Sequence, residues 1–164
     1  MGELKHSRHC VGGSNYHYQF TPKYRRPIFW GMDTRKLVEA VIRMKLAVLG
    51  IELGAIEFGP DHVHLFLKNC EKYTVPDIAR HIKGFSSHYL RKNYNYLFRR
   101  YLWGNSFWSD GYFYESIGRV TSDTVVYYIK HSQGKHWMHD SADTLSYANR
   151  AGKLEQSRLE RFGA

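Results

Sequence analysis

The hydrophobic pattern of the first fifty residues predicts a strand followed by a helix. Large and polar side chains alternate over residues 16–21, and Pro22 ends this run, which is typical of a strand. Apolar residues then recur at helical spacing over residues 34–49. Gly50 follows at the position where helices commonly end, so the pattern predicts a helix that stops there.

The remaining pattern predicts a hairpin and three further elements. Two apolar runs, residues 51–58 and 63–67, flank the turn sequence at residues 59–61 and indicate an antiparallel hairpin. The elements expected after the hairpin are a helix over residues 76–92, a strand over residues 111–117 and a helix over residues 121–133.

The resulting order is β-α-β-β-α-β plus a C-terminal helix. Helices that pack on one face of an antiparallel sheet predict an α+β, ferredoxin-like sandwich. We expect residues 1–14 to be a flexible arm, residues 15–140 a single domain and residues 141–164 a polar C-terminal tail. A chain of 164 residues is long enough for one core of ordinary size.

The charge balance indicates a polyanionic partner. Lys and Arg number 24 against 15 Asp and Glu, so the formal net charge is +9. Aromatic residues make up 16% of the chain, and aromatic faces can stack on unpaired bases beside the cations. Together these two features favour nucleic acid as the partner.

Cysteine usage and the N-terminus indicate the compartment. Cys10 and Cys70 have neither metal-ligand spacing nor the pattern of a disulfide framework, which is typical of free thiols in a reducing environment. The N-terminal segment lacks the apolar core of a signal peptide, and no apolar run approaches the length of a membrane span. We therefore expect a cytoplasmic protein.

The sequence HVH at residues 62–64 is the first candidate for chemistry. On a strand, residues two apart point to the same face, so the His62 and His64 rings converge. Two imidazoles can hold a divalent cation with coordination positions left open for a phosphate oxygen. The alternative is a pair of half-exposed strand histidines with no ligand.

The predicted C-terminal helix is the second candidate. Its segment from Tyr127 to Gln133 offers two phenols, a third imidazole and an amide close together. A tyrosine with its usual pKa near 10 is a weak nucleophile. A phosphodiester that is polarised by a metal can nevertheless be attacked by a weaker nucleophile. The alternative is that tyrosines in an apolar helix fill the core.

Several motifs together resemble one family. Besides HVH after a turn aspartate, the chain contains KYRRPIF, HIKGFSSHYLRK, LWGNSFWSDGYFYESIG and VVYYIKHSQGK in this order. This arrangement, over residues 16–135, is similar to the insertion sequence 200-like transposases, which are HUH endonucleases with a single catalytic tyrosine. The resemblance implies a DNA transposase that cleaves and rejoins single-stranded DNA, with hairpins at the element ends as its substrate.

The resemblance also implies roles for individual residues. His62 and His64 would bind Mg²⁺ or Mn²⁺, and Tyr128 would attack the scissile phosphate and form a 5′-phosphotyrosine intermediate on a C-terminal catalytic helix. The family usually places a glutamine ligand four residues after its tyrosine, whereas Gln133 lies five residues after Tyr128. The third ligand therefore stays open between Gln133 and the alternatives His131 and Asp61, and Tyr127 is the alternative nucleophile.

The same resemblance implies a homodimer in which the tyrosine helix of one chain acts in trans on the histidines of the other. The residues expected to bind DNA are Lys23, Tyr24, Arg25, Arg26, Lys83, Arg91, Lys92, Arg119 and Lys130. Tyr24, Trp103, Phe107 and Trp108 are expected either to stack on bases or to fill the core.

Two other functions fit the same order of elements. A non-catalytic RNA- or DNA-binding module of ferredoxin-like fold is one, although the RNA recognition motif requires an aromatic-rich pattern on its central strands and the hairpin here reads HVHLFLKN. A rolling-circle-type replication initiator is the other, although such proteins usually carry larger accessory domains. Retention of nucleic-acid binding without metal and in His62→Ala would favour the binding module.

Overall fold

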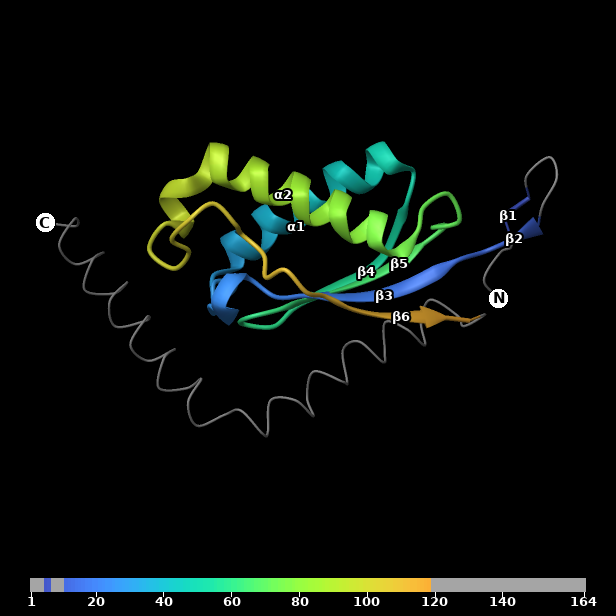
Figure 1. Ribbon diagram of the computed structural model, residues 1–164, viewed down its shortest axis with the longest axis horizontal. Helices are drawn as coiled ribbons and strands as arrows, with labels where there is room; N and C mark the ends of the chain where they lie inside the picture. Colours follow the sequence, from blue (N-terminus) through green and yellow to red (C-terminus); the bar gives the residue numbers. More distant parts are fainter. Residues whose placement is uncertain (1–4, 7–10, 119–164) are drawn as a thin grey trace, which may run out of the picture. The chain divides into compact units, whose positions relative to one another are not determined.

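The computed structural model describes residues 5–6 and 11–118. These residues belong to the first of two compact units, Met1–Ile129 and Lys130–Ala164. Within the described part, a four-stranded sheet and two helices form the body of the domain (Figure 1). No helix of this part is long and apolar enough to cross a membrane.

The sheet has the topology that the order of elements predicts. Its strands are β3 (Asn15–Phe20), β4 (Glu52–Phe58), β5 (Val63–Lys68) and β6 (Phe113–Ile117). They lie in the order β4-β5-β3-β6, and each neighbouring pair is antiparallel. This is the strand order of a ferredoxin-like sandwich, and the α+β prediction is confirmed.

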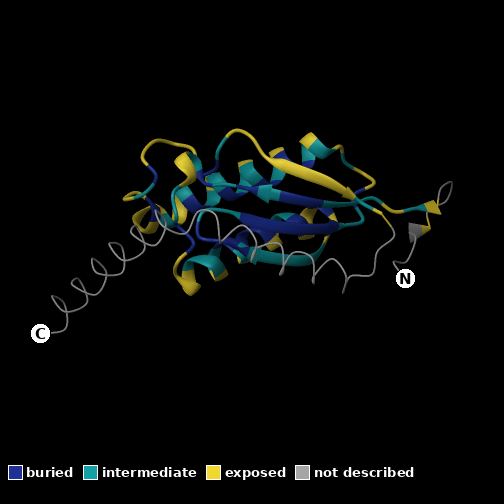
Figure 2. Ribbon diagram, turned by 90° about the horizontal axis from the view of Figure 1, so that it is seen from below, coloured by how far each residue is buried: buried dark blue, intermediate teal, exposed yellow. Residues whose placement is uncertain are grey.

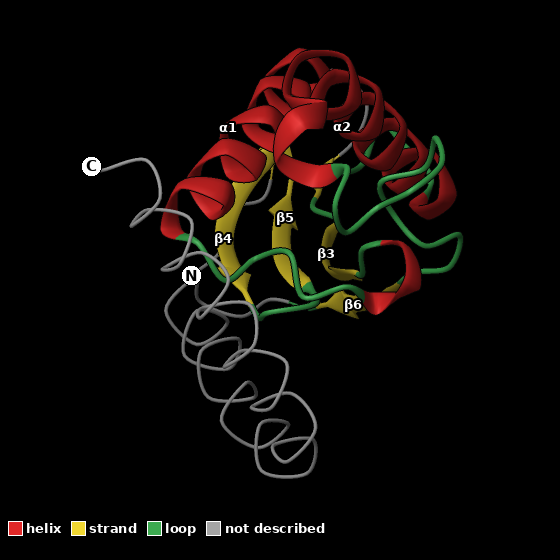
Figure 3. Ribbon diagram, turned by 90° about the vertical axis from the view of Figure 1, so that its left-hand side faces the viewer, coloured by secondary structure: helices red, strands yellow, loops and turns green. Residues whose placement is uncertain are grey.

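Both helices cover one face of this sheet (Figure 3). They are α1 (Met32–Leu49), which ends at Gly50 in the left-handed conformation (φ 69°), and α2 (Val75–Phe98). The N-terminus of α2 is capped by Thr74, whose hydroxyl accepts a hydrogen bond from the Asp77 N–H at 3.3 Å. The apolar stripes of the helices meet the sheet in one core, which contains Tyr18, Phe20, Ile42, Leu65 and Ile82 among its fully buried members.

The second helix is longer than its pattern predicts. Leu90 lies on its buried face, but the backbone leaves helical geometry at Tyr94 (φ −132°, ψ 24°), and the helix then continues to Phe98, which is buried again. A kink rotates the residues after it relative to those before it, so the apolar period across residues 93–98 is lost. The predicted end at Lys92 is wrong for this reason.

Two short segments complete the described part. In the N-terminal segment expected as an arm, β1 (Lys5–His6) pairs antiparallel with β2 (Val11–Gly12). After β3 the chain forms a short 3-10 turn, η1 (Lys23–Arg25), with Tyr24 at φ 62° and Arg25 at φ 49°. The strand β6 is an exposed edge beside buried central strands (Figure 2).

Candidate active site

The paired histidines lie at the start of β5, on the sheet face that turns away from the helices. Alternation along the strand sends Val63, Leu65 and Leu67 into the core, where each is fully buried. His64 therefore points to the opposite face, and His62 immediately precedes the strand. The predicted hairpin thus presents both imidazoles at one end of the sheet, as the spacing of HVH indicates.

A close approach of backbone to ring fixes the place of His62. The Gly59 N–H donates a hydrogen bond to the His62 carbonyl at 2.9 Å and closes the turn. A Cβ atom on residue 59 would lie only 2.3 Å from Cε1 of the His62 ring. Only glycine leaves room for the imidazole in this position.

Asp61 links His62 to a cation on another segment. The Nδ1 of His62 lies 2.8 Å from Asp61 Oδ1, and Arg25 donates from Nε to Oδ2 of the same carboxylate at 3.2 Å. Burial raises the pKa of Asp61, but the hydrogen bond and charge of His62 and then those of Arg25 outweigh it, so the pKa lies below its usual value. An ionised Asp61 accepts a hydrogen bond from Nδ1 of His62, which leaves Nε2 on the opposite edge of the ring to face a ligand.

His64 has an orienting partner that the sequence reasoning missed. Nε2 of His17, on β3, lies 2.8 Å from Nδ1 of His64, and the two rings stack with centroids 5.0 Å apart. His17 is 5% exposed, and burial lowers its pKa despite the opposing charge of Glu115, so this ring is neutral. With Nδ1 of His64 as the donor in this pair, Nε2 of His64 is the nitrogen that can bind a metal.

The two imidazoles fit part of a metal site. The ring centroids of His62 and His64 are 5.0 Å apart and their planes are nearly perpendicular, at 86°. Both Nδ1 atoms are engaged by orienting partners, which is the usual arrangement around metal-binding histidines. Residues 5–6 and 11–118 contain no group of three or more His, Cys, Asp or Glu able to hold a metal ion.

Asp61, an alternative third ligand, has both of its carboxylate oxygens in contact with other side chains. Its Oδ1 lies at Nδ1 of His62 and its Oδ2 at the Arg25 guanidinium. A metal held by Nε2 of His62 would lie on the other edge of the ring. The contacts of Asp61 therefore favour an orienting role over coordination.

Comparison with known proteins identifies the family of this chain. Residues 10–132 match the family described as "Transposase IS200 like", which is most of the chain. The chain belongs to the IS200-like transposase family. This confirms the resemblance noted in the sequence, and it makes the chain a member of a family of DNA-cleaving and strand-transferring enzymes that act in DNA transposition.

Individual relatives agree with this assignment. The transposase for insertion sequence element IS200 of Salmonella typhimurium is 31% identical over 131 residues, which cover 80% of this chain and 84% of the relative. A candidate transposase from Deinococcus radiodurans, solved as a crystal structure, superposes with a TM-score of 0.62 and 26% identity, covering 77% of this chain and 96% of that one. A REP-associated tyrosine transposase bound to a REP hairpin shares the fold, with a TM-score of 0.54, 18% identity and coverage of 80% and 73%.

Several predicted site residues of the transposase lie outside the described residues. They are Arg119, Tyr127, Tyr128, Lys130, His131 and Gln133. Their expected roles as nucleophile, third ligand and DNA contacts stay predictions.

The predicted DNA-binding cations of the transposase separate into two groups. The exposed group contains Arg25, which also pairs with Asp61, and Lys92 on the surface of α2. Lys23, Lys83 and Arg91 bond to the protein itself. Lys23 pairs with the Asp110 carboxylate at 3.3 Å. Arg91 donates to the backbone carbonyls of Leu102 and Ser106 at 2.8 and 2.9 Å. This guanidinium holds the segment after α2 against the helix, so its geometry is that of a structural residue.

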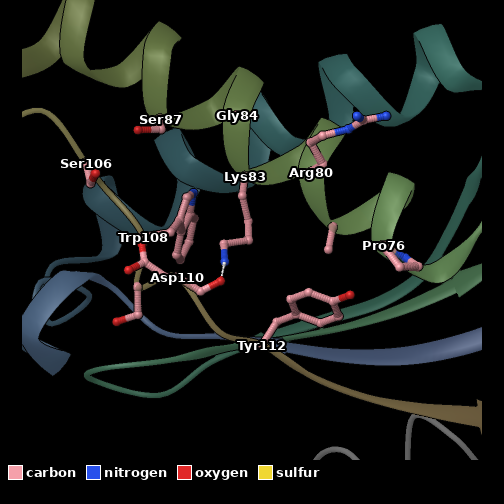
Figure 4. A pocket seen from close by; sticks show the side chains of 11 residues that line it. Pro76, Arg80, Lys83, Gly84, Ser87, Ser106, Trp108, Asp110 and Tyr112 are labelled. Atoms are coloured by element: carbon pink, nitrogen blue, oxygen red, sulfur yellow. Dashed lines mark hydrogen bonds between the residues drawn. The ribbon is translucent and has the colours of Figure 1, made fainter.

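Lys83 belongs to the same structural group. It lines an open pocket of about 400 Å³ between α2 and residues 106–112, and its Nζ donates to the carbonyl oxygens of Asp110 and Gly111 at 2.8 and 3.1 Å (Figure 4). Burial lowers the pKa of Lys83, against the opposing charge of Asp110. With its ammonium committed to backbone oxygens, Lys83 supports the pocket wall.

The four aromatic residues considered for base stacking differ in their exposure to solvent. Phe107 and Trp108 are 0% and 3% exposed and belong to the core, where the Trp108 indole donates to the Ser86 hydroxyl at 2.8 Å. Tyr24 and Trp103 are 51% and 55% exposed. Of the four aromatics considered for base stacking, these two can reach a ligand from solvent.

Proposed function

We propose that this transposase cleaves and rejoins single-stranded DNA by attack of Tyr128 on a phosphodiester beside a divalent metal held by His62 and His64. The observation that carries this proposal is the engagement of both Nδ1 atoms, by Asp61 and by His17, at 2.8 Å each. In each ring this leaves Nε2, on the opposite edge, as the nitrogen that would coordinate the metal.

The metal is expected to be Mg²⁺ or Mn²⁺, with Gln133 as third ligand and His131 as the alternative. When bound, the ion would polarise a phosphate oxygen and favour nucleophilic attack at phosphorus. Five residues of a regular helix span about 500°, which places Gln133 roughly 140° from Tyr128 around the axis. A π-bulge or a frayed helix end near Gly134 would bring the amide back to the face of the phenol.

The reaction is an exchange of one phosphate ester for another. The Tyr128 oxygen forms a bond to phosphorus and loses its proton, while the bond to the 3′ oxygen breaks and that oxygen is protonated to a 3′-OH. The phosphate remains on the tyrosine as a 5′-phosphotyrosine. This new ester conserves the free energy of the cleaved phosphodiester bond for the rejoining step. In the reverse direction a 3′-OH attacks and releases the tyrosine, so no external energy source is needed.

The proposed substrate is single-stranded DNA that carries hairpins at the element ends. Its phosphates would contact Lys23, Arg25, Arg26, Lys92, Arg119 and Lys130 on a chain of net charge +9. A transposase of the same fold was solved with a REP hairpin, and hairpin DNA is the natural first substrate to test here.

We further propose that the enzyme is a homodimer in which the tyrosine helix acts in trans. Among the described strands β6 is an edge that pairs only with β3, and its Phe113 and Tyr114 are half exposed. An edge of this kind can pair with the same strand of a second copy. A trans arrangement would supply the phenol and the third ligand from the partner subunit.

A cleavage assay tests the proposed chemistry. The protein is incubated with labelled single-stranded DNA containing a hairpin, with Mn²⁺, Mg²⁺ or EDTA, and the products are separated under denaturing conditions. We expect cleavage that requires the metal and disappears in His62→Ala and His64→Ala, with Lys36→Ala on α1 as an exposed control. Binding without cleavage, unaffected by these substitutions, would instead identify a non-catalytic binding module.

A further inference from the structure

Two exposed aromatic rings form a stack on the surface of the domain. Tyr24 in η1 and Trp103 in the segment after α2 lie with ring centroids 4.7 Å apart and planes 16° from parallel. The guanidinium of Arg26 lies 4.7 Å from the centroid of the Trp103 ring. We call these three side chains the aromatic platform.

The aromatic platform is open to solvent. Tyr24 has one face against Trp103 and is still 51% exposed, so its other face is available to a flat ligand. Phe107 and Trp108, close to Trp103 in the sequence, are instead buried in the core. A stacked aromatic pair that stays exposed while its neighbours are buried is typical of a surface that binds something flat.

The backbone holds Tyr24 in this position at a conformational cost. Tyr24 and Arg25 both have positive φ angles, 62° and 49°, in the left-handed region that side chains other than glycine disfavour. The flanking chain is tied to the segment before β6: the Lys23 N–H donates to the Phe107 carbonyl and the Ser109 hydroxyl to the Pro22 carbonyl, each at 2.9 Å. Strain that the surroundings enforce at two successive residues indicates a functional loop.

The same loop is joined directly to the paired histidines. Arg25, between Tyr24 and Arg26 in the sequence, donates to Asp61, and Asp61 in turn contacts Nδ1 of His62. These two contacts connect the loop that carries the aromatic platform to the histidine site. Arg25 and Arg26 also give this surface a positive charge, which suits a ligand attached to phosphates.

We infer that the aromatic platform stacks on an unpaired base of the DNA strand, one that flanks the phosphodiester cleaved at the histidines. The inference rests on the proposed function for the identity of this strand. A base inside a duplex already has neighbours on both of its faces, so the platform selects a single-stranded nucleotide next to the site of cleavage. The stacked base would hold the strand in register while the phosphate is attacked.

Fluorescence of a base analogue tests this inference. Single-stranded oligodeoxynucleotides carry a fluorescent adenine analogue at successive positions around the cleavage site, and full-length protein is titrated in EDTA so that no chemistry occurs. We expect quenching at one position flanking the cleaved phosphodiester, and an affinity about tenfold or more lower in Tyr24→Ala, as for loss of one base stack. Tyr24→Phe should retain both the quenching and the affinity.

Control variants separate stacking from general effects. Tyr96→Ala removes another exposed tyrosine, on α2, and should leave affinity and quenching unchanged. Trp103→Ala removes the second ring without altering the strained η1 backbone, and it should reproduce the loss seen in Tyr24→Ala. Wild-type affinity and quenching in both Tyr24→Ala and Trp103→Ala would overturn the inference.

These experiments distinguish failure of the base-stacking inference from failure of the proposed function. If His62→Ala abolishes metal-dependent cleavage while Tyr24→Ala and Trp103→Ala bind DNA normally, the chemistry stands and the platform is rejected. If the platform variants lose affinity but the wild-type protein cleaves no DNA under any metal condition, the platform stands as a single-strand binding site and the proposed chemistry is rejected.

Discussion

Nε2 of His17 lies 2.8 Å from Nδ1 of His64, so a buried imidazole on β3 contacts the histidine that β5 presents at the site. The two residues are 47 positions apart in the chain and meet because β3 and β5 are paired neighbours in the sheet. The corresponding partner of His62 is Asp61, the residue immediately before it. One candidate metal ligand thus depends on a local contact, and the other depends on the correct assembly of the sheet.

Removal of the His17 imidazole should weaken metal binding without unfolding the protein. In His17→Phe the ring of His64 loses the partner that fixes its tautomer and orientation, and we expect the affinity for Mn²⁺ to fall by about 10–100-fold. Titration calorimetry with Mn²⁺ measures this change. His17→Gln keeps a polar group that can hydrogen-bond Nδ1 and should recover part of the affinity; equal affinities in all three proteins would show that His17 only fills space.

The two glycines at positions 59 and 84 should respond in opposite ways to alanine. Gly59→Ala brings a methyl group into the space of the His62 ring, so we expect loss of Mn²⁺ binding and cleavage in a folded protein. Gly84→Ala meets no atom within 4 Å inside α2, and it should stabilise the protein by about 0.5–1 kcal/mol. Thermal unfolding and cleavage are measured for both; normal cleavage in Gly59→Ala would contradict the described packing of His62.

The Asp61 carboxylate should matter to the metal more than to the fold. In Asp61→Ala the Nδ1 of His62 and the Arg25 guanidinium both lose their acceptor. We expect Mn²⁺ affinity to fall by about 10–100-fold, with a change in stability of only about 1 kcal/mol because Arg25 is largely exposed. Arg25→Ala serves as the comparison, since it removes the cation but keeps the contact between Asp61 and His62. A larger loss of affinity in Arg25→Ala than in Asp61→Ala would contradict this assignment.

The identity of the metal should follow the softness of its ligands. Imidazole nitrogen binds Mn²⁺ more strongly than Mg²⁺, which prefers oxygen ligands. We therefore expect calorimetry to give tighter binding of Mn²⁺ than of Mg²⁺ to the wild-type protein, and the difference to disappear in the double variant His62→Ala, His64→Ala. Tighter binding of Mg²⁺ would indicate a site built mainly of carboxylates.

Cys70 should be unreactive in the folded protein well into the alkaline range. Burial, and then the charge of Glu71, raise the pKa of its thiol from 9.0 to about 12. Because the folded pKa of this acid is raised, its contribution to stability is complete below pH 9.0 and is lost as the pH rises toward 12. In a Cys10→Ser background, alkylation by iodoacetamide at pH 9 should be about 100-fold or more slower in native protein than in urea. Similar rates in the two states would show that the thiol is accessible.

Much of the fold follows from local pattern. Alternation over residues 16–21 and the apolar run over residues 63–67 identify the central strands, and the helical period ending at Gly50 identifies α1 almost to its boundaries. The end of α2 does not follow in this way, because the change of backbone angles at Tyr94 interrupts the apolar period before the helix stops.

Only those parts of the candidate site that depend on residues close together in the sequence could be predicted. The HVH spacing brings His62 and His64 together on any strand, whereas the contact between His17 and His64 requires knowledge of which strands pair. The alternation in β3 could have suggested a polar face at His17, but it gives no partner. Similarly, Lys83 and Arg91 have the charge of DNA contacts in sequence, and only the packing of residues 102–111 reveals that their donors bond to backbone carbonyls.

The most direct test of the central claim is to locate the DNA on the protein. Wild-type protein is incubated with hairpin-bearing single-stranded DNA and Mn²⁺, denatured and digested with protease and nuclease, and the modified peptide is sequenced by mass spectrometry. We expect a nucleotide 5′-phosphate on Tyr128, formed only with metal and absent in the double variant His62→Ala, His64→Ala. Cleavage without any tyrosine adduct would contradict the proposed chemistry, and modification of Tyr127 in place of Tyr128 would contradict the assignment of the nucleophile.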